Sequence, residues 1–194
     1  VPRRPRLRRV TLDGLVARCE LSELAASFLA AAVRTRRSIV VAGAQGAGKT
    51  TLVRALCAEI PKHEAIGTFE TEYELHLHEL RDQHPLVFAM EAGPHVTHDY
   101  AVRAIASAID VVVHVHLETP PTADGTPQRQ RWVAEIITVT GGEKEKGYAI
   151  QHVFRTHPGD REATPHVLDD SYRDLARWGF DLEGFYATAR GAAS

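Results

Sequence analysis

The chain has 194 residues, enough for one domain with a sizeable core, and its 44% hydrophobic and 25% charged residues are ordinary for a globular protein. A formal net charge of −2 argues against a nucleic-acid partner, and no apolar run approaches the ~18 residues that a membrane-spanning helix needs. Two cysteines are too few for a disulfide framework, which favours a reducing, cytoplasmic location. The basic cluster PRRPRLRR predicts a solvated linker over residues 1–10; a nucleic-acid or acidic-lipid arm is the alternative.

The apolar residues predict alternating helices and strands in the first half of the chain and mainly strands in the second. Short β-branched runs indicate buried strands, whereas apolar residues three and four apart indicate one face of a helix. The predicted elements are helix 21–33, strand 38–42, helix 49–60, strands 65–69 and 86–90, helix 99–109, strands 111–115, 131–140 and 148–154, and helix 171–178. This order predicts an α/β fold with a mostly parallel sheet, extended by a C-terminal antiparallel hairpin region.

Residues 43–50 read GAQGAGKT and fit the phosphate-loop pattern G-x-x-x-x-G-K-[ST], between a predicted strand and a predicted helix. Glycines let backbone N–H groups turn toward phosphate oxygens, and the helix adds its positive N-terminal end. Lys49 would neutralise the β- and γ-phosphates, and the Thr50 hydroxyl would coordinate Mg²⁺. A glycine-rich turn without a ligand is the weaker alternative. The predicted ATP- or ADP-binding residues are Gly43, Ala44, Gln45, Gly46, Ala47, Gly48, Lys49, Thr50 and Thr51.

Nucleotide cleavage also needs carboxylates that hold the metal ion and orient water. Glu70 closes the strand that follows the loop helix, and Glu72 and Glu74 come directly after it. A carboxylate at that strand end would face the γ-phosphate if the two strands were neighbours, so Glu70 is the nearest candidate. A solvated acidic turn is the alternative. Glu91, which ends the apolar run LVFAM, is a further and weaker candidate for the second acid.

These residues resemble the ATPases of type II and type IV secretion and pilus assembly, in particular the CpaF-like ATPases of tight-adherence (Flp) pili. The segment 11–61 resembles the entry into that family's C-terminal motor domain, and FETEYEL resembles its acidic box, E-D-x-x-E-L. The match assigns Glu70 and Glu74 to the box as catalytic candidates, with Thr71 in place of the usual Asp. Residues 104–118 and 129–140 resemble the closing hairpin region. The resemblance implies a RecA-like domain that binds ATP with Mg²⁺ and works as a ring of six.

The resemblance covers residues 11–155 but lacks an internal part of the family pattern. The family carries a strand ending in Gly-Glu, its Walker B, and a Thr-His histidine box between the acidic box and the closing region. Here Met90-Glu91-Ala92 runs directly into GPHVTHDYAVRAIASAID, so about two strand–helix units, about 60 residues, are absent. By this alignment Glu91 precedes the lost segment, and His95 and His98 follow it. None of the three therefore corresponds to the missing residues.

The resemblance therefore implies a truncated motor domain over residues 11–155, followed by a tail at 156–194 with one short helix. Its ATP hydrolysis would be impaired because the second acid is lost. Its implied partners are copies of itself and inner-membrane secretion or pilus platform proteins, at the cytoplasmic face of the membrane. A non-enzymatic nucleotide-binding remnant or adaptor is the first alternative, and another phosphate-loop NTPase or kinase is the second.

Eleven histidines raise the question of a bound metal ion. His76 and His78, like His114 and His116, lie two residues apart, so each pair would share one face of a strand. Such a pair binds a metal ion if a third ligand converges on it. Because no Cys/His spacing signature accompanies either pair, ordinary surface histidines are favoured.

Overall fold

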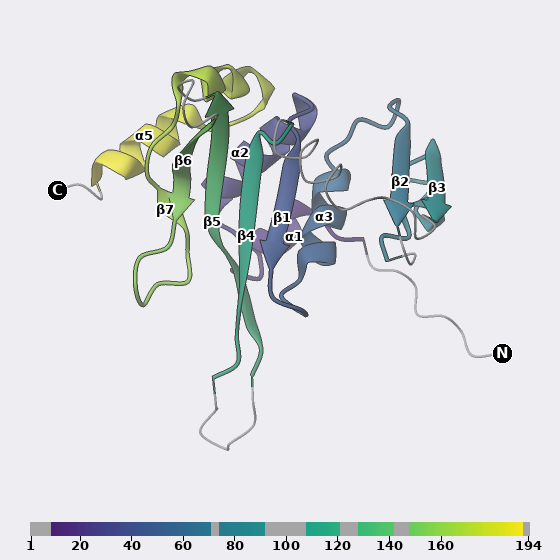
Figure 1. Cartoon of the computed structure of the whole chain (residues 1–194), viewed down its shortest axis with the longest axis horizontal. Helices are drawn as coiled ribbons and strands as arrows, with labels where there is room; N and C mark the ends of the chain where they lie inside the picture. The colour runs from purple at the N-terminus through teal and green to yellow at the C-terminus, as the bar shows by residue number, and fades with distance from the viewer. Residues whose placement is uncertain (1–8, 71–73, 92–107, 121–127, 142–147, 192–194) are drawn as a thin grey trace.

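The computed structural model describes residues 9–70, 74–91, 108–120, 128–141 and 148–191. The strands predicted from the sequence are present, whereas the predicted helix at 99–109 falls almost entirely outside the described residues. Figure 1 shows the helices and strands of the described residues, and η denotes a 3₁₀ helix. The elements are α1 (Leu12–Val16), α2 (Glu23–Arg34), β1 (Ile39–Gly43), α3 (Lys49–Cys57), β2 (Ile66–Glu70), η1 (Leu77–Glu79), β3 (Val87–Glu91), β4 (Val111–Glu118), β5 (Gln130–Gly141), β6 (Tyr148–Arg155), β7 (Thr164–Pro165), η2 (Asp170–Trp178) and α5 (Leu182–Gly191).

The main sheet is mixed, with five strands in the order β1-β4-β5-β6-β7. β1 pairs with β4 in parallel, with Ile39 opposite Val111 and Gly43 opposite Val115. The other three pairs are antiparallel. The fold is therefore α/β, and the predicted C-terminal antiparallel region is present in β4, β5 and β6. Because β1–β4 is the one parallel pair in the described main sheet, this sheet is not mostly parallel as predicted. The reason is that β4, β5 and β6 follow one another in the chain and pair as neighbours, which makes them antiparallel.

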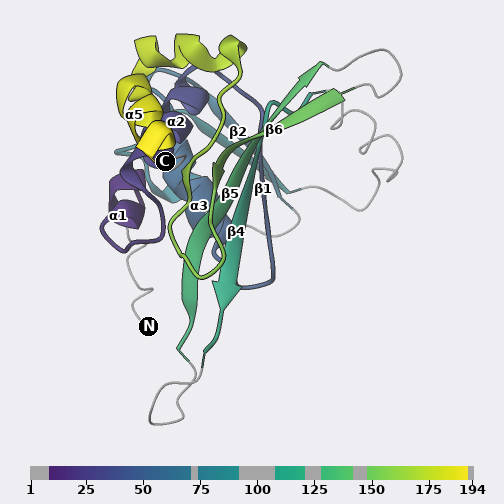
Figure 2. The ribbon, with the colours of Figure 1, turned by 90° about the vertical axis from the view of Figure 1, so that its left-hand side faces the viewer.

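Helices α1, α2, α3 and α5 cover one face of this sheet (Figure 2). In β4, Val111, Val113 and Val115 are buried and alternate with half-exposed residues, so one face of the strand points into the core. Side-chain caps fix the starts of the first two helices. The Thr11 side chain accepts a hydrogen bond from the Gly14 N–H at the start of α1, and the Ser22 side chain accepts one from the Ala25 N–H at the start of α2. The core therefore lies between the sheet and this single helix layer.

The C-terminal segment is more structured than the sequence predicted. The helix predicted at 171–178 is present as the 3₁₀ helix η2, and α5 is a second helix in the tail, for which the sequence predicts one helix. Gly179, with φ of 101°, ends η2, and the Asp181 side chain accepts a hydrogen bond from the Gly184 N–H in the first turn of α5. Phe180 and Phe185 on either side of this junction are buried in the core. The tail therefore completes the core.

β2 and β3 form a separate, two-stranded parallel sheet in which Ile66 lies opposite Val87 and Glu70 opposite Glu91. β2 does not pair with β1, so the two strands are not neighbours in one sheet. A cavity of about 390 Å³ lies beside the free edge of β1, lined by Ile39 and Val41 and by residues of α3 and β2. β3 pairs with β2 and lies beyond it (Figure 1).

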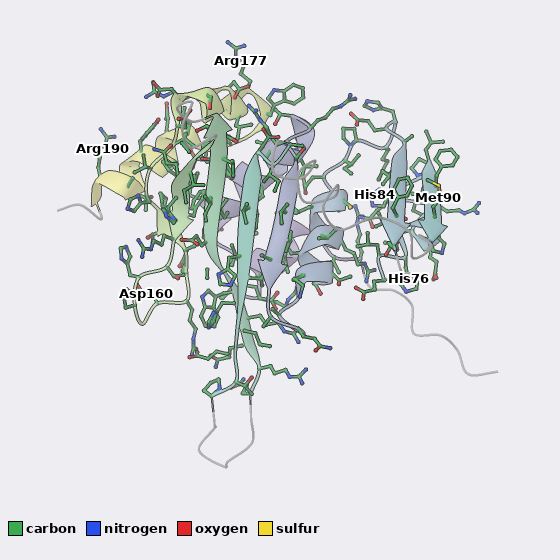
Figure 3. The ribbon with its side chains drawn as sticks, viewed as in Figure 1. His76, His84, Met90, Asp160, Arg177 and Arg190 are labelled. Carbon is green, nitrogen blue, oxygen red and sulfur yellow. The ribbon has the colours of Figure 1, made fainter. Side chains whose placement is uncertain are left out.

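The β2–β3 sheet presents an apolar face to solvent. Phe69, Phe88 and Met90 are 72%, 64% and 44% exposed, and Phe69 lies opposite Met90 in the register. Figure 3 shows Met90 at this end of the molecule. Exposed apolar strands are sites of association between chains. The face therefore predicts aggregation of the isolated protein.

We expect Phe88→Lys to slow the aggregation of the purified protein on warming, measured by light scattering, with little effect on the free energy of unfolding. The added charge would interrupt the apolar face without entering the core. Trp178→Lys is the matched control because Trp178 is 50% exposed and lies on η2, in the main body. An equal gain from the control would show that added charge alone is responsible.

Candidate functional site

The turn between β1 and α3 has the backbone geometry that its glycines allow. Gly46 and Gly48 have φ of 77° and 99°, in the left-handed region that favours glycine. Gly43 is required for a different reason: a Cβ there would collide with the backbone oxygen of Val115 on β4. The parallel pairing of β1 with β4 therefore brings the first glycine of the pattern against the neighbouring strand.

Lys49 lies across this turn. Its Nζ donates hydrogen bonds to the carbonyl oxygens of Gly43 and Ala44, both at 3.0 Å. α3 begins at the same residue, so its first N–H groups have no partners within the helix and carry the positive end of its dipole. An ammonium group and these amides together form an environment suited to an anion.

Thr50 connects the turn to the acidic stretch after β2. Its Oγ1 donates a hydrogen bond to Glu74 Oε2 at 2.9 Å. Glu70 Oε2 instead accepts hydrogen bonds from the backbone N–H groups of Glu74, at 2.9 Å, and Leu75, at 2.8 Å. Of these two carboxylates, Glu74 is the one that contacts α3, and Glu70 anchors the backbone that carries it.

The pKa values of two groups fit this arrangement. Burial alone would raise the pKa of Glu70, but hydrogen bonds from the backbone N–H groups of Leu75 and Glu74 and the charge of His76 outweigh it, so its pKa lies below the usual value. Burial, with a smaller contribution from Glu70, raises the pKa of Cys57 to about 11. Glu70 is therefore charged at neutral pH, and the Cys57 thiol on α3 is neutral and unreactive.

Of the two remaining acidic candidates, Glu72 and Glu91, only the backbone of Glu91 is described. Glu72 lies outside the described residues, as do Thr71, His95 and His98. The backbone of Glu91 ends β3, opposite Glu70. The described part of the chain thus brings Thr50 together with Glu74, and Glu74 with Glu70.

Arg131 of β5 is a site residue that the sequence reasoning assigned only to the hairpin. Its Cδ lies 3.5 Å from the position that a Cβ on Gly48 would take. Its Nε is buried and has no hydrogen-bond partner among the described residues. It also lines a cavity of about 350 Å³ beside the start of α3, together with Gly48, Thr51 and Leu15. This contact is non-local, and no sequence spacing signals it.

The fold and the site together define an α/β protein whose strand–turn–helix unit carries the phosphate-loop pattern. No protein-family model matches the chain. Part of it is similar to type IV secretion proteins: 51% identical over 49 residues to VirB11 of Bartonella quintana, 52% over 50 to PtlH of Bordetella pertussis, and 46% over 66 to VirB11 of Brucella suis. These matches cover 25%, 26% and 34% of this chain and 14%, 15% and 18% of the relatives.

One comparison with a solved structure concerns a protein of the same name. The crystal structure of the VirB11 ATPase from the Brucella suis type IV secretion system, in complex with sulphate, is 23% identical and has a TM-score of 0.36. The alignment covers 69% of this chain and 66% of that one. The local sequence similarity is thus to secretion-system proteins, and it extends over less than a fifth of each relative's length.

Among the described residues, no helix combines the length and the apolar character that crossing a bilayer requires.

Proposed function

We propose that this chain binds ATP or ADP with Mg²⁺ through residues 43–51, as part of the motor domain of a secretion or pilus-assembly ATPase. The observation that supports it best is the joint placement of Lys49 across the glycine turn and of Thr50 against Glu74. The similarity to VirB11 and PtlH supports the secretion system. The narrower link to the tight-adherence pilus branch is our proposal from sequence resemblance.

The residues of the turn fit a bound triphosphate. The turn would accommodate phosphate oxygens close to the backbone, because Gly46 leaves open space where another residue would carry a side chain. The Lys49 ammonium would exchange its carbonyl partners for the β- and γ-phosphates. Thr50 Oγ1 and a Glu74 oxygen, 2.9 Å apart, are both oxygen ligands of the kind that Mg²⁺ prefers. Mg²⁺ would supply charge neutralisation of the phosphates.

The nucleoside would occupy the cavity beside Gly48 and Thr51. Its apolar lining includes Leu15, Leu52 and Val115, which suits a flat base, and its volume of about 350 Å³ is that of a small ligand site. Arg131, whose buried Nε has no hydrogen-bond partner in the part of the chain that the structure describes, lies at the boundary between this cavity and the turn. We propose that its guanidinium contacts the α-phosphate or the ribose.

We further propose that hydrolysis is slow. Glu74 can hold Mg²⁺ or orient water but not both, because the two positions are separated in space. β1 and β2, which flank the site, are not paired, and a cavity lies between them where a further strand would bring a second acid. Removing one such electrostatic group typically costs about 10²–10³ in rate. The same feature favours the alternative function, a non-enzymatic nucleotide-binding adaptor.

Assembly and location are proposals of the same kind. The resemblance implies a ring of six copies that works with inner-membrane secretion or pilus platform proteins at the cytoplasmic face. Such rings complete their sites at subunit boundaries, so a lone subunit would be a poor enzyme. Size-exclusion chromatography with light scattering, with and without ATP and Mg²⁺, would measure the assembly directly.

The test of the proposed function is nucleotide affinity and turnover in wild type, Glu74→Gln and Glu70→Gln. We expect wild type to bind ATP more tightly with Mg²⁺ than with EDTA and to turn over below about 1 s⁻¹, the lower end of the usual enzyme range. Glu74→Gln should reduce the gain in affinity that Mg²⁺ gives, since the carboxylate charge is lost. Glu70→Gln should reduce it less, because an amide oxygen still accepts the two backbone hydrogen bonds.

Two outcomes would contradict this proposal. No measurable ATP binding by wild type would exclude the nucleotide site itself. Turnover of about 1 s⁻¹ or more, unchanged in both variants, would exclude slow hydrolysis and the roles given to Glu74 and Glu70.

A further inference from the structure

The residues His76, His78 and Glu79 form a cluster outside the proposed nucleotide site. His76 Nδ1 lies 3.1 Å from Glu79 Oε1, and His78 Nε2 lies 3.9 Å from the same oxygen. One ligand atom from each of the three residues lies within 4.8 Å of the other two. Figure 3 shows His76 at the β2–β3 end of the molecule, away from the five-stranded sheet.

The turn that carries the cluster is held in place by its backbone and by one buried side chain. Leu77, between the two histidines, is only 1% exposed, so the turn is fixed to the protein while both imidazoles stay at the surface. The Glu79 N–H donates to the His76 carbonyl, and the adjacent Leu75 N–H donates to Glu70. In such a 3₁₀ turn, residues three apart project to the same side, which brings Glu79 beside His76.

His76 has a left-handed backbone conformation, with φ of 50°. Histidine is one of the residues other than glycine that adopt this region more often than most. Here the conformation turns the chain at the start of η1 and places the His76 ring on the side where Glu79 projects.

From this geometry we propose that His76, His78 and Glu79 bind a transition-metal dication of the zinc class. Two imidazole nitrogens and a carboxylate oxygen are a common three-ligand set for Zn²⁺, with solvent in the fourth position. Ligand atoms already within 4.8 Å of one another need only small side-chain rotations to meet a shared ion at about 2.0–2.2 Å. Mg²⁺ and Ca²⁺, which prefer oxygen ligands, would not compete for this site.

The second histidine pair of the chain, on β4, lacks a third ligand beside it among the described residues. His114 and His116 lie on β4, their ring centroids are 6.3 Å apart, and the His116 ring packs against Trp132 at 4.6 Å. The nearest strand partner of His114 is Glu135, which instead contacts His152 Nδ1 at 2.7 Å. In the described part of the chain, His76, His78 and Glu79 are the group in which three potential ligand atoms lie within 4.8 Å of one another.

The experiment is a Zn²⁺ titration of the untagged full chain by competition with a fluorescent chelator, repeated with Co²⁺ to record its ligand-field absorption. We expect one Zn²⁺ per chain. His76→Ala, His78→Gln and Glu79→Gln should each weaken it by at least about tenfold, because loss of even a supporting group costs 10–100-fold. The matched control is His114→Ala/His116→Ala, which removes the same H-x-H spacing from β4. Cys19→Ser controls for the exposed thiol.

Several outcomes would overturn the proposal. The urea-unfolded protein measures how tightly its histidines bind Zn²⁺ without a folded site. If the folded protein binds Zn²⁺ no more tightly than the unfolded protein does, the fold builds no metal site. Equal losses in the 76–79 variants and in the His114→Ala/His116→Ala control would show general binding by surface histidines. Far-ultraviolet circular dichroism would confirm that each variant is folded, which is expected because Leu77 remains in place.

Discussion

Replacing Lys49 with alanine should weaken ATP binding by at least about a hundredfold, equivalent to about 2.7 kcal/mol of binding free energy. The ammonium lies across the glycine turn, where it contacts the Gly43 and Ala44 carbonyl oxygens. Hydrogen bonds to charged groups contribute about 1.5–3 kcal/mol each, and Lys49 would make two with the β- and γ-phosphates. Isothermal titration calorimetry at fixed Mg²⁺ would measure the change.

The free energy of unfolding should change by less than about 1 kcal/mol in this variant, because half-buried surface substitutions outside the core are usually mild. Lys62→Ala is the matched control: Lys62 is exposed, lies beyond α3, and should leave ATP affinity unchanged. Inorganic tripolyphosphate should lose affinity for Lys49→Ala by the same factor as ATP. An unchanged affinity in Lys49→Ala would exclude the phosphate-binding role of the turn.

The turn could be predicted from the sequence because its determinants are local. Gly46 and Gly48 supply left-handed conformations, and the helix that follows begins at Lys49, all within a few residues. The Thr50–Glu74 contact could not be predicted in the same way, because it joins α3 to the loop after β2. The sequence placed Glu70 nearest the phosphates on the assumption that β1 and β2 are neighbours, whereas β2 pairs with β3.

Strand existence was also predictable, but strand partners were less so. The short β-branched runs that become β1 and β4 are recognisable in the sequence as buried strands. Which parallel neighbour each strand takes depends on long-range packing that no window of the sequence reports. Because β2 pairs with β3 and not with β1, one edge of β1 is left free beside an apolar cavity.

The C-terminal tail shows a different limit of sequence reasoning. Residues after 178 read as polar ends, because two phenylalanines among charged and small residues give a weak helical pattern. The three-dimensional structure shows why those phenylalanines matter. Phe180 and Phe185 are ring neighbours at 5.7 Å, and Phe185 also contacts Phe154 of β6 at 5.4 Å. The tail is thus held by an aromatic cluster that includes Phe28 and Phe154, both more than 20 residues away in the chain.

Phe28 of α2 is the centre of that cluster, and Phe28→Ala should destabilise the protein by about 3–5 kcal/mol. Its side chain is fully buried, and its ring centroid lies 5.4 Å from Phe180, 5.8 Å from Phe154 and 6.1 Å from Tyr172. The loss combines the transfer of the ring from water, the cavity left behind and edge-to-face contacts of about 0.5–1.5 kcal/mol each. Because domains have only about 5–15 kcal/mol of stability in total, the variant would be close to unfolding.

Denaturant unfolding followed by tryptophan fluorescence and circular dichroism would measure this difference. Phe69→Ala is the matched control, since it deletes the same atoms from a side chain that is 72% exposed, and should change the free energy of unfolding by at most about 0.5 kcal/mol. If Phe28→Ala does not fold, Phe28→Leu keeps most of the volume and should cost about 1–2 kcal/mol. A loss below about 1 kcal/mol for Phe28→Ala, or one equal to that of Phe69→Ala, would show that α2, β6 and the tail do not share one core.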